Sequence, residues 1–384
     1  MNVETMRKID YWIGIPLTFL ATALVWLLDR LAATGDAAIR PPRKVGFIEL
    51  SEMGSAILAD PAMRAMQAQG AVIYFVIFKK NAPSLQLLNT VPPERIFTID
   101  AEGLWGLTRD TFRLLLWTRR VGLDTVIDLE LFSRYSALLT GLSGARRRVG
   151  FHAFYNEGLY RGEMLTHRVA YNPHQHIAKS FMALVNAALS ERPEYPFSKR
   201  VVEDDAIRLA RAVVTDAQRE AMRDRIRQRY PAYAPDRQRL ILINPNASEL
   251  LVQRRWMPER YIELMQRLIA AHDDCLVAIT GAPEEYAEAE ALKAAVASAR
   301  CLNFAGGCQL AELPTLYAIA TLMVSNDSGP GHFSAVTDLR TFILFGPETP
   351  ALYGSLGRST PIFAGLACSP CVSAANHRKT PCRN

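Results

Sequence analysis

The sequence predicts an α/β protein with two Rossmann-like domains, each built on a parallel sheet, and a hydrophobic helix near the N-terminus. The chain has 384 residues, which suits two domains of roughly 150 to 180 residues each. From Lys44 onward, short β-branched runs alternate with segments of helical periodicity, and this alternation is typical of a parallel sheet with right-handed crossovers. Tyr11 to Leu28 form an 18-residue run without charge, which predicts the hydrophobic helix.

We divide the chain accordingly into five segments. They are a hydrophobic anchor helix (1–40), an N-terminal Rossmann-like domain (41–190), a linker with a helix (191–235), a C-terminal Rossmann-like domain (236–365) and a Cys-rich tail (366–384). Such domains bind ligands beyond the carboxyl ends of their strands, so two of them are expected to face a cleft.

The first half of the chain predicts five strands with helices between them. The run 71–78 lacks alternation and predicts a strand buried on both faces. The other predicted strands are 44–50, 95–100, 124–130 and 146–151, the last closing the sheet, and the helices are 54–70 and 106–122. The polar, Pro-containing segments 171–180 and 191–200 around a short helix indicate an interdomain linker.

The second half repeats the pattern after a long charged helix, predicted over 203–229. Pro258 suits the first turn of a helix, because its missing N–H has no partner there in any case. The predicted strands are 239–246, 275–281, 321–327 and 340–347, and the predicted helices are 258–272, 284–299 and 310–320.

The apolar run near the N-terminus has three interpretations. A membrane anchor, spanning or re-entrant, is favoured because Arg7, Lys8 and Arg30 flank the run and suit anionic headgroups. A cleaved signal peptide is disfavoured by the length of the run and the missing small-x-small site. The third interpretation is a peripheral helix lying in the membrane interface.

Charge and cysteines restrict the partners and the compartment. The net charge of +6 favours anionic partners, namely phosphate-bearing ligands, nucleic acid or an anionic membrane. The six cysteines do not form the pattern of a secreted disulfide framework, which indicates a reducing compartment. Cys368, Cys371, His377 and Cys382 have irregular spacing, and a zinc site, a redox pair and neither role all remain open.

One strand-to-helix turn, 326–332, concentrates polar and glycine residues. Glycines let a backbone approach a ligand closely, and Pro330 suits a helix start. The N–H groups of a helix start favour an anion such as a diphosphate. The alternative is a helix capped by Asp327 or Ser328 with nothing bound.

Four segments carry distinctive motifs, namely "IELSEMGSAILADPAMRAM", "INPNASELLVQRRWMPERYIELM", "SNDSGPGHFSA" and "DLRTFILFGPETP". Together they resemble the heptosyltransferase-like family of glycosyltransferases, the ninth in the sugar-transferase classification. In the last segment, Phe345-Gly346-Pro347-Glu348 fills the slot of that family's Phe-Gly-Pro-Thr. The resemblance extends from about Lys44 to Pro350, and the Asp-Ser-Gly-Pro-x-His element is its most specific part.

The resemblance implies a GT-B fold, with the nucleotide sugar held mainly by the C-terminal domain and the acceptor by the N-terminal one. It implies a metal-independent, inverting transferase without a cofactor, typically moving heptose from ADP-heptose onto the lipopolysaccharide inner core. Arg254 stands where a family lysine meets the phosphates, and arginine can do so bidentately. The donor-binding residues implied by position are Asn246, Ser248, Arg254, Asp327, Ser328, Gly329 and His332.

The expected catalytic base is missing from its place. The family's first turn ends in Gly-Asp, whereas this sequence has Gly54-Ser55, and a serine hydroxyl is no base at neutral pH. Glu52, in the same turn, is our first candidate for the base, and Asp60 is the second. No Asp-x-Asp motif stands in a suitable loop, so helix starts and Arg254 would stabilise the leaving diphosphate.

The leading hypothesis is therefore a glycosyltransferase on the cytoplasmic face of the inner membrane, anchored by residues 11–28. Its expected partners are a nucleotide sugar, a lipid-linked glycan or lipopolysaccharide acceptor and the membrane, but not nucleic acid. Ser55 motivates the alternative of a non-catalytic nucleotide-sugar-binding or glycan-assembly protein with the same fold. A two-domain nucleotide-sugar epimerase is less favoured, because the turns carry no carboxylate-rich catalytic set.

Overall fold

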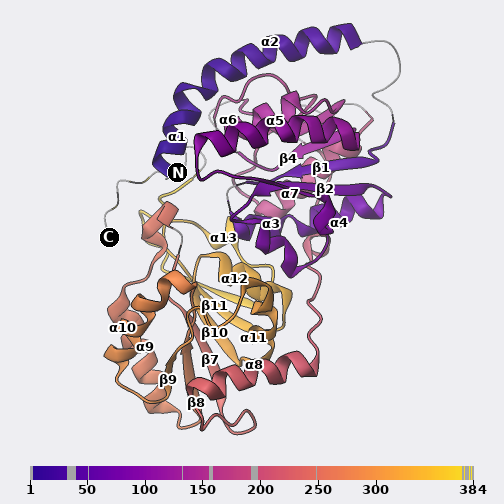
Figure 1. Ribbon diagram of the computed structural model, residues 1–384. Helices are drawn as coiled ribbons and strands as arrows, with labels where there is room; N and C mark the ends of the chain where they lie inside the picture. Colours follow the sequence, from indigo (N-terminus) through magenta and orange to yellow (C-terminus); the bar gives the residue numbers. More distant parts are fainter. Residues whose placement is uncertain are drawn as a thin grey trace. The chain divides into compact units, whose positions relative to one another are not determined.

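The computed structural model describes residues 3–32, 40–50, 52–131, 133–154, 159–191, 198–247, 249–373, 376, 380 and 382. The chain divides into two compact units (Figure 1). The first consists mainly of Met1–Leu85 and Asn89–Arg208, and the second mainly of Leu209–Cys371. The division after Arg208 falls inside the segment that the sequence predicts to be a linker and helix.

The first unit is built on a six-stranded parallel sheet of order β3-β2-β1-β4-β5-β6. Helices α5 and α6 pack on one face, and α4 and α7 on the other (Figure 1). The strands are β1 (Lys44–Ile48), β2 (Val72–Phe78), β3 (Ile96–Ile99), β4 (Thr125–Asp128), β5 (Arg147–Phe151) and β6 (His167–Val169). The helices are α3 (Met53–Leu58), α4 (Asp60–Ala68), α5 (Leu104–Val121), α6 (Arg134–Leu142) and α7 (Ile177–Leu189).

The second unit has a parallel sheet of order β12-β11-β10-β7-β8-β9, with α9 and α10 on one face and α8, α11 and α12 on the other (Figure 1). Its strands are β7 (Arg239–Asn244), β8 (Cys275–Ile279), β9 (Cys301–Asn303), β10 (Leu322–Asn326), β11 (Arg340–Phe345) and β12 (Ser359–Phe363). Its helices are α8 (Asp216–Arg229), α9 (Pro258–Ala271), α10 (Tyr286–Val296), α11 (Leu313–Ile319), α12 (Gly329–Phe333) and α13 (Pro350–Tyr353).

Both sheets have the Rossmann strand order, because each reads 3-2-1-4-5-6 when its own strands are numbered along the chain. The order reverses between β1 and β4 in the first unit and between β7 and β10 in the second. Ligands of such sheets bind beyond the carboxyl ends of the strands at this switch point. The fold therefore points to the residues that follow these four strands.

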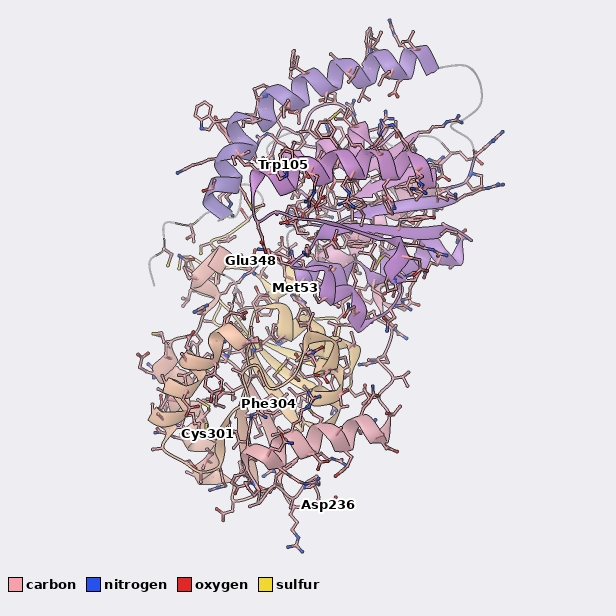
Figure 2. The ribbon with its side chains drawn as sticks, viewed as in Figure 1. Met53, Trp105, Asp236, Cys301, Phe304 and Glu348 are labelled. Atoms are coloured by element: carbon pink, nitrogen blue, oxygen red, sulfur yellow. The ribbon has the colours of Figure 1, made fainter. Side chains whose placement is uncertain are left out.

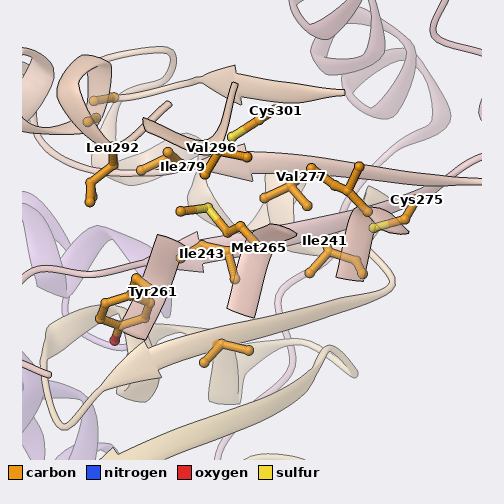
Figure 3. Packing of buried hydrophobic residues seen from close by; sticks show 14 residues of the cluster. Ile241, Ile243, Tyr261, Met265, Cys275, Val277, Ile279, Leu292, Val296 and Cys301 are labelled. Atoms are coloured by element: carbon orange, nitrogen blue, oxygen red, sulfur yellow. The ribbon is translucent and has the colours of Figure 1, made fainter. Parts of the chain in front are cut away.

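A continuous apolar core supports the second switch point. Side chains of β7, β8 and β9 pack against Tyr261 and Met265 of α9 (Figure 3). Burial raises the pKa of the Tyr261 phenol, so the hydroxyl stays protonated and can donate. It donates to Oδ1 of Asn326 at 2.8 Å, which links the core directly to the end of β10.

The edges of the sheets differ from the prediction. The strand at 146–151 does not close the first sheet, because β6 pairs with β5 beyond it. The sequence reading also missed β9 and β12. β9 has three residues, and β12 is largely exposed and contains Pro361, so both lack the long apolar run that marks an inner strand.

Two predicted helices are wrong in extent. The helix over 54–70 is split into α3 and α4 at Ala59, because Pro61 cannot donate a backbone hydrogen bond and opens the second helix. The charged helix over 203–229 begins only at α8, where Thr215 and Gln218 form a capping box. Before it, the N–H of Ala212 donates to the carbonyl of Val336 at 2.8 Å.

The polar segments 171–180 and 191–200 indicate a linker around a short helix, whereas the predicted domain boundary at residue 190 assigns that helix to the N-terminal domain. In the structure the helix is α7, which belongs to the first unit. α7 buries most of one face, including Phe181, Leu184 and Val185, and packs on β5, β6 and α4. The sequence of α7 is more hydrophobic than the polar segments on either side, and this difference was the available signal for a buried helix.

The N-terminal hydrophobic segment forms α1 (Val3–Trp12) and α2 (Gly14–Ala32). α2 lies along α6, and the face it turns inward carries Gly14, Thr18, Ala21 and Val25. These positions are spaced at i, i+4, i+7 and i+11, so small side chains let the two helices approach closely. Gly14–Leu31 is long and apolar enough to cross a membrane, and 22% of this window is buried in the protein.

Candidate functional site

The end of β10 is cross-linked by one buried side chain, that of Asn326. Its Nδ2 donates to the carbonyl of Pro245 at 2.6 Å, which fixes the turn after β7. Its Oδ1 accepts from Tyr261 and, at 3.1 Å, from the backbone N–H of Trp256. Asn326 therefore holds three segments in register beneath the predicted donor site, and its own role is positioning.

Arg254 lies at this site as predicted by position, but it already has two carboxylate partners. Its Nη2 is bonded to Glu348, and its Nε lies 3.4 Å from Oδ2 of Asp327. All three side chains are less than a tenth exposed. One guanidinium thus faces two carboxylates, and the formal charges of these three side chains add up to −1.

Glu348 is a residue whose role sequence reasoning missed. It stands in the turn after β11 and is 1% exposed (Figure 2). Its neighbour Gly346 permits close approach to the Arg254 segment, since a Cβ there would lie 3.3 Å from the carbonyl of Gln253. The signal was the replacement of the family's threonine by an acid in the same quartet that resembles the family.

The turn 327–332 forms a shorter helix than its motif suggested. α12 has five residues, so its dipole is small, and the expected anion-binding helix start is reduced to a few local N–H groups. Ser328 is the N-cap residue, but in the described part of the chain its side chain makes no cap bond and instead donates to the carbonyl of Asn326 at 3.2 Å. Gly331 lets α12 approach Ile343, and His332 is buried.

The turn after β7 supplies a buried acceptor. Asn246 is 5% exposed, and within the described residues its Oδ1 has no hydrogen-bond partner. Such an atom costs about 1–3 kcal/mol, which a ligand donor could offset. Arg255 is close by, donating to the carbonyl of Ala247 at 3.1 Å with its side chain about one-third exposed. Ser248, the other predicted contact of this turn, lies outside the described residues.

The first switch point is held by two buried carboxylates. Glu49 follows β1 and its Oε1 accepts from the N–H of Glu52 at 3.2 Å. Glu130 follows β4 and its Oε1 accepts from the N–H of Leu50 at 2.9 Å. Asn81 adds a third restraint, since its Nδ2 donates to the carbonyl of Leu50 at 2.7 Å. The turn that precedes α3 is thus fixed from three strands.

The predicted catalytic residues occupy different environments in this unit. Glu52 is half-buried and is the N-cap residue of α3, whose first residue, Met53, is labelled in Figure 2. Ser55 lies in the first turn of α3 and is also half-buried. Asp60 is fully buried, and its carboxylate binds Nε of Arg64 at 2.8 Å and the hydroxyl of Thr90. These contacts give Asp60 a structural role and leave Glu52 as the more accessible of the two candidate carboxylates.

A second buried acid near this turn is also structural. Asp128 ends β4 and is bonded to Arg161 and to the hydroxyl of Ser136 at 3.1 Å. Burial raises the pKa of Asp128, and the Arg161 charge opposes that shift. With its oxygens engaged, Asp128 braces β4 against α6.

Among the described residues, no cluster of three or more His, Cys, Asp or Glu side chains has the geometry of a metal site. In the tail, Cys368 and Cys382 are exposed and the hydroxyl of Thr380 lies 3.5 Å from Sγ of Cys371. His377 lies outside the described residues, so the role of the tail stays open.

Two parallel Rossmann-like domains, with polar turns at both switch points, define a protein of the GT-B class. The chain belongs to glycosyltransferase family 9 (heptosyltransferase), whose family profile matches residues 113–380, more than half of its length.

Curated relatives resemble parts of the chain. Lipopolysaccharide heptosyltransferase 2 of Salmonella typhimurium is 33% identical over 100 residues, which are 25% of this chain and 28% of that protein. Lipopolysaccharide heptosyltransferase 1 of Pseudomonas aeruginosa is 29% identical over 148 residues, or 36% of this chain and 41% of that protein. The chain therefore matches less than half of the length of these relatives.

Solved structures share the fold over more of the chain. The E. coli ADP-heptose lipopolysaccharide heptosyltransferase II has a TM-score of 0.67 at 20% identity and covers 83% of this chain and 90% of its own. The E. coli heptosyltransferase WaaC with ADP has a TM-score of 0.59 at 18% identity, covering 84% and 93%. These similarities confirm the predicted fold.

Proposed function

We propose that this protein is an inverting glycosyltransferase that moves heptose from ADP-heptose onto the lipopolysaccharide core or a related lipid-linked glycan. The observation that carries the proposal is the coincidence of the family's motifs with the two topological switch points. The turns after β7 and β10 form the donor site, and the turn after β1 carries the base. Membership in family 9 favours transfer over epimerisation.

The donor would be bound by groups of the second unit. Asn246 offers a buried acceptor, and Ser248, Ser328, Gly329 and His332 stand at the family's donor positions. Because Glu348 and Asp327 neutralise Arg254, we propose that Arg254 contributes directional hydrogen bonds more than net charge. Arg255, beside the same turn, lies 3.7 Å from Oε2 of Glu288 in a partly exposed pair that solvent screens. It would supply the further positive charge that a diphosphate needs.

The chemistry would be a direct displacement. Glu52 takes the proton of the acceptor hydroxyl. The hydroxyl oxygen of the acceptor forms the new glycosidic bond to the anomeric carbon of the donor. At the same time the bond between that carbon and the diphosphate breaks. The electron pair leaves with the diphosphate, which the donor site stabilises. We propose that no divalent metal takes part. Glu49 and Glu130 position the turn that carries Glu52.

We propose that the protein works on the cytoplasmic face of the inner membrane, where a nucleotide sugar is available. The exposed apolar surface of α1 and α2 supports this localisation. The relatives whose names state lipopolysaccharide heptosyltransferase suggest the same acceptor class for this chain.

A panel of nucleotide sugars tests the proposal. The full-length protein should bind ADP-heptose more tightly than UDP- and GDP-sugars in calorimetry, and should transfer heptose equally with EDTA or magnesium. Activity lost in EDTA and restored by magnesium would contradict the metal-independent route. Binding without transfer to any core acceptor would favour the alternative of a non-catalytic binding or assembly protein, which the Ser55 substitution motivates.

Replacing Arg254 and replacing its partner Glu348 should change the affinity for ADP in opposite directions. Arg254→Ala should weaken ADP binding by about 1–3 kcal/mol through lost charge-assisted hydrogen bonds. Glu348→Gln keeps the size and removes one negative charge, so ADP should bind more tightly. If the lost repulsion between Glu348 and the diphosphate amounts to about 1.4 kcal/mol, the affinity for ADP should rise tenfold. Calorimetric titration with ADP measures both.

Arg239→Ala is the matched control, because this exposed arginine pairs with Asp274 at the opposite end of β7. It should leave ADP binding unchanged. Thermal unfolding of each variant separates binding from stability, since Arg254→Ala leaves two buried carboxylates without their cation. Weaker ADP binding by Glu348→Gln would show that the acid is needed to orient Arg254 more than it repels the diphosphate.

A further inference from the structure

Helix α5 presents an apolar stripe to the outside of the first unit. Trp105 is 79% exposed, Phe112 is 65% exposed and Leu116 is 70% exposed, and Leu104 adjoins them. Residues 105, 112 and 116 are spaced at i, i+7 and i+11, so they share one side of the helix. The opposite side packs inward through Leu114 and Thr118. Figure 2 shows Trp105 on this helix.

The stripe is bordered by positive charge. α5 contains four arginines, Arg109, Arg113, Arg119 and Arg120, and one acid, Asp110. Arg109 and Arg113 both pair with Asp110, at 2.9 and 3.3 Å. The helix therefore keeps a net charge of +3, counted as four arginines less one aspartate. Exposed aromatic rings beside arginines suit the headgroup region of an anionic bilayer.

The outer face of α1 and α2 has the same character. Trp12, Phe19, Leu20, Trp26 and Leu31 are each more than half exposed. The guanidinium of Arg30 lies 4.2 Å from the ring centre of Trp26, which places an arginine beside an aromatic ring here too.

Contacts to α6 join α2 and α5 into one layer. α2 packs along α6 through its small residues, and the hydroxyl of Thr111 on α5 hydrogen-bonds that of Tyr135 on α6 at 2.7 Å. α5 and α6 both pack on the same side of the first sheet, against β3 and β4 respectively, and α2 lies along α6 (Figure 1). The apolar stripe of α5 and the outer face of α2 thus belong to one side of one unit.

α2 is too firmly held to cross a bilayer on its own. Asp10, at the end of α1, pairs with the buried Arg134 at 3.0 Å, and Asp29 pairs with the buried Arg148. The hydroxyl of Thr22 accepts the N–H of Glu163 at 2.9 Å. A spanning helix would have to give up these contacts and take the paired carboxylates away from two buried arginines.

We propose that α1, α2 and α5 form one membrane-binding face for a bilayer that contains anionic lipid, with α2 lying in the interface plane. The apolar side chains enter the headgroup and acyl boundary while the arginines contact phosphate groups. This deepens the proposed localisation and does not depend on sugar transfer.

Vesicle flotation of the full-length protein tests the face. Phosphatidylcholine vesicles with phosphatidylglycerol should bind wild type at least tenfold more strongly than vesicles without it. The triple change Trp105→Ser, Phe112→Ser and Leu116→Ser should lower partitioning onto the anionic vesicles about tenfold or more. Arg113→Glu with Arg120→Glu should lower it on anionic vesicles only. The matched control is Val201→Ser, Val213→Ser and Tyr286→Ser, three exposed apolar side chains elsewhere, which should change nothing.

Three results would overturn the proposal. If the α5 triple variant binds vesicles as strongly as wild type, α5 is not part of the membrane-binding face. If wild type binds both vesicle types equally, the arginines do not contribute to membrane binding. A change from dimer to monomer in light scattering, without an effect on vesicles, would make the face a contact between protein chains. Retained ADP binding and thermal stability in the variants keep this test separate from the proposed transferase activity.

Discussion

Replacing Glu52 with glutamine is expected to lower turnover by about 10²- to 10⁴-fold, the usual cost of losing a general base. The amide keeps the size of the side chain but cannot accept the proton of the acceptor hydroxyl. Donor affinity should stay nearly unchanged, because the proposed donor-binding residues belong to the second unit. The acidic limb of the pH–rate profile should disappear with the carboxylate. Steady-state transfer assays over pH, with ADP titrations alongside, measure these effects.

A second-site change sharpens this test. Ser55 stands in the first turn of α3, three residues after Glu52, at the position where the family carries an aspartate. Ser55→Asp places a carboxylate where a helix start favours negative charge. In the Glu52→Gln background it should restore a substantial part of the lost turnover. Asp60→Asn is the control, and it should lower thermal stability through Arg64 and Thr90 without a specific loss of turnover.

If Glu52→Gln keeps wild-type turnover while Glu49→Gln or Asp60→Asn abolishes it, the base is wrongly placed. If none of the three changes matters and no donor is turned over by wild type, the binding-protein alternative takes precedence.

Asp10→Ala is expected to destabilise the first unit by about 3–5 kcal/mol, the cost of breaking a buried ion pair from one side. Oδ2 of Asp10 binds Arg134, and Oδ1 accepts the backbone N–H groups of Arg134 at 2.8 Å and Tyr135 at 3.1 Å. One carboxylate therefore caps the start of α6 and neutralises a buried guanidinium. Denaturant unfolding of the full-length protein in mild detergent measures the change in free energy.

Asp216→Ala provides the comparison, since Asp216 pairs with Arg219 at the surface and is 97% exposed. Surface pairs contribute roughly 0–1 kcal/mol, so this variant should unfold almost like wild type. Equal effects of the two changes would mean that α1 is loosely attached. Removing α1 and α2 altogether should likewise destabilise the protein, since Arg134, Ala137 and Met164 would lose their cover.

The inner strands could be predicted because they are apolar and buried, whereas three of the four edge strands were missed. β1, β2, β7 and β10 bury almost every side chain and produce continuous hydrophobic runs. β6, β9 and β12 lie at the sheet edges, where short or exposed strands leave no such pattern. The break at Ala59 was visible in Pro61, but the helical periodicity on both sides outweighed it in the prediction.

The sequence placed Arg254 and Asp327 at motif positions but did not show the charges around them. Asp327 and Arg254 stand at motif positions, so their place followed from the resemblance. The partner Glu348 is 94 residues away from Arg254, and only the fold brings them together. For the same reason no local pattern showed that Glu130 holds the N–H of Leu50, 80 residues away.

For the N-terminal segment, length and hydropathy could not distinguish a spanning helix from one that lies on the surface. The small-residue spacing of Gly14, Thr18, Ala21 and Val25 was the available signal for the packing of α2 on α6. Asp10 and Asp29 stand close to the two ends of this segment, and the structure pairs both of them with buried arginines.

The most direct test of the central claim is a transfer assay with ADP-heptose and a purified lipopolysaccharide-core acceptor. Full-length protein in EDTA is incubated with both, and ADP release and acceptor mass are followed together. We expect one heptose gained by the acceptor for each ADP released, with inverted anomeric configuration in the product and at least a hundredfold lower rate for Glu52→Gln. Wild-type protein that binds ADP-heptose but releases no ADP and leaves every core acceptor unchanged would contradict the account.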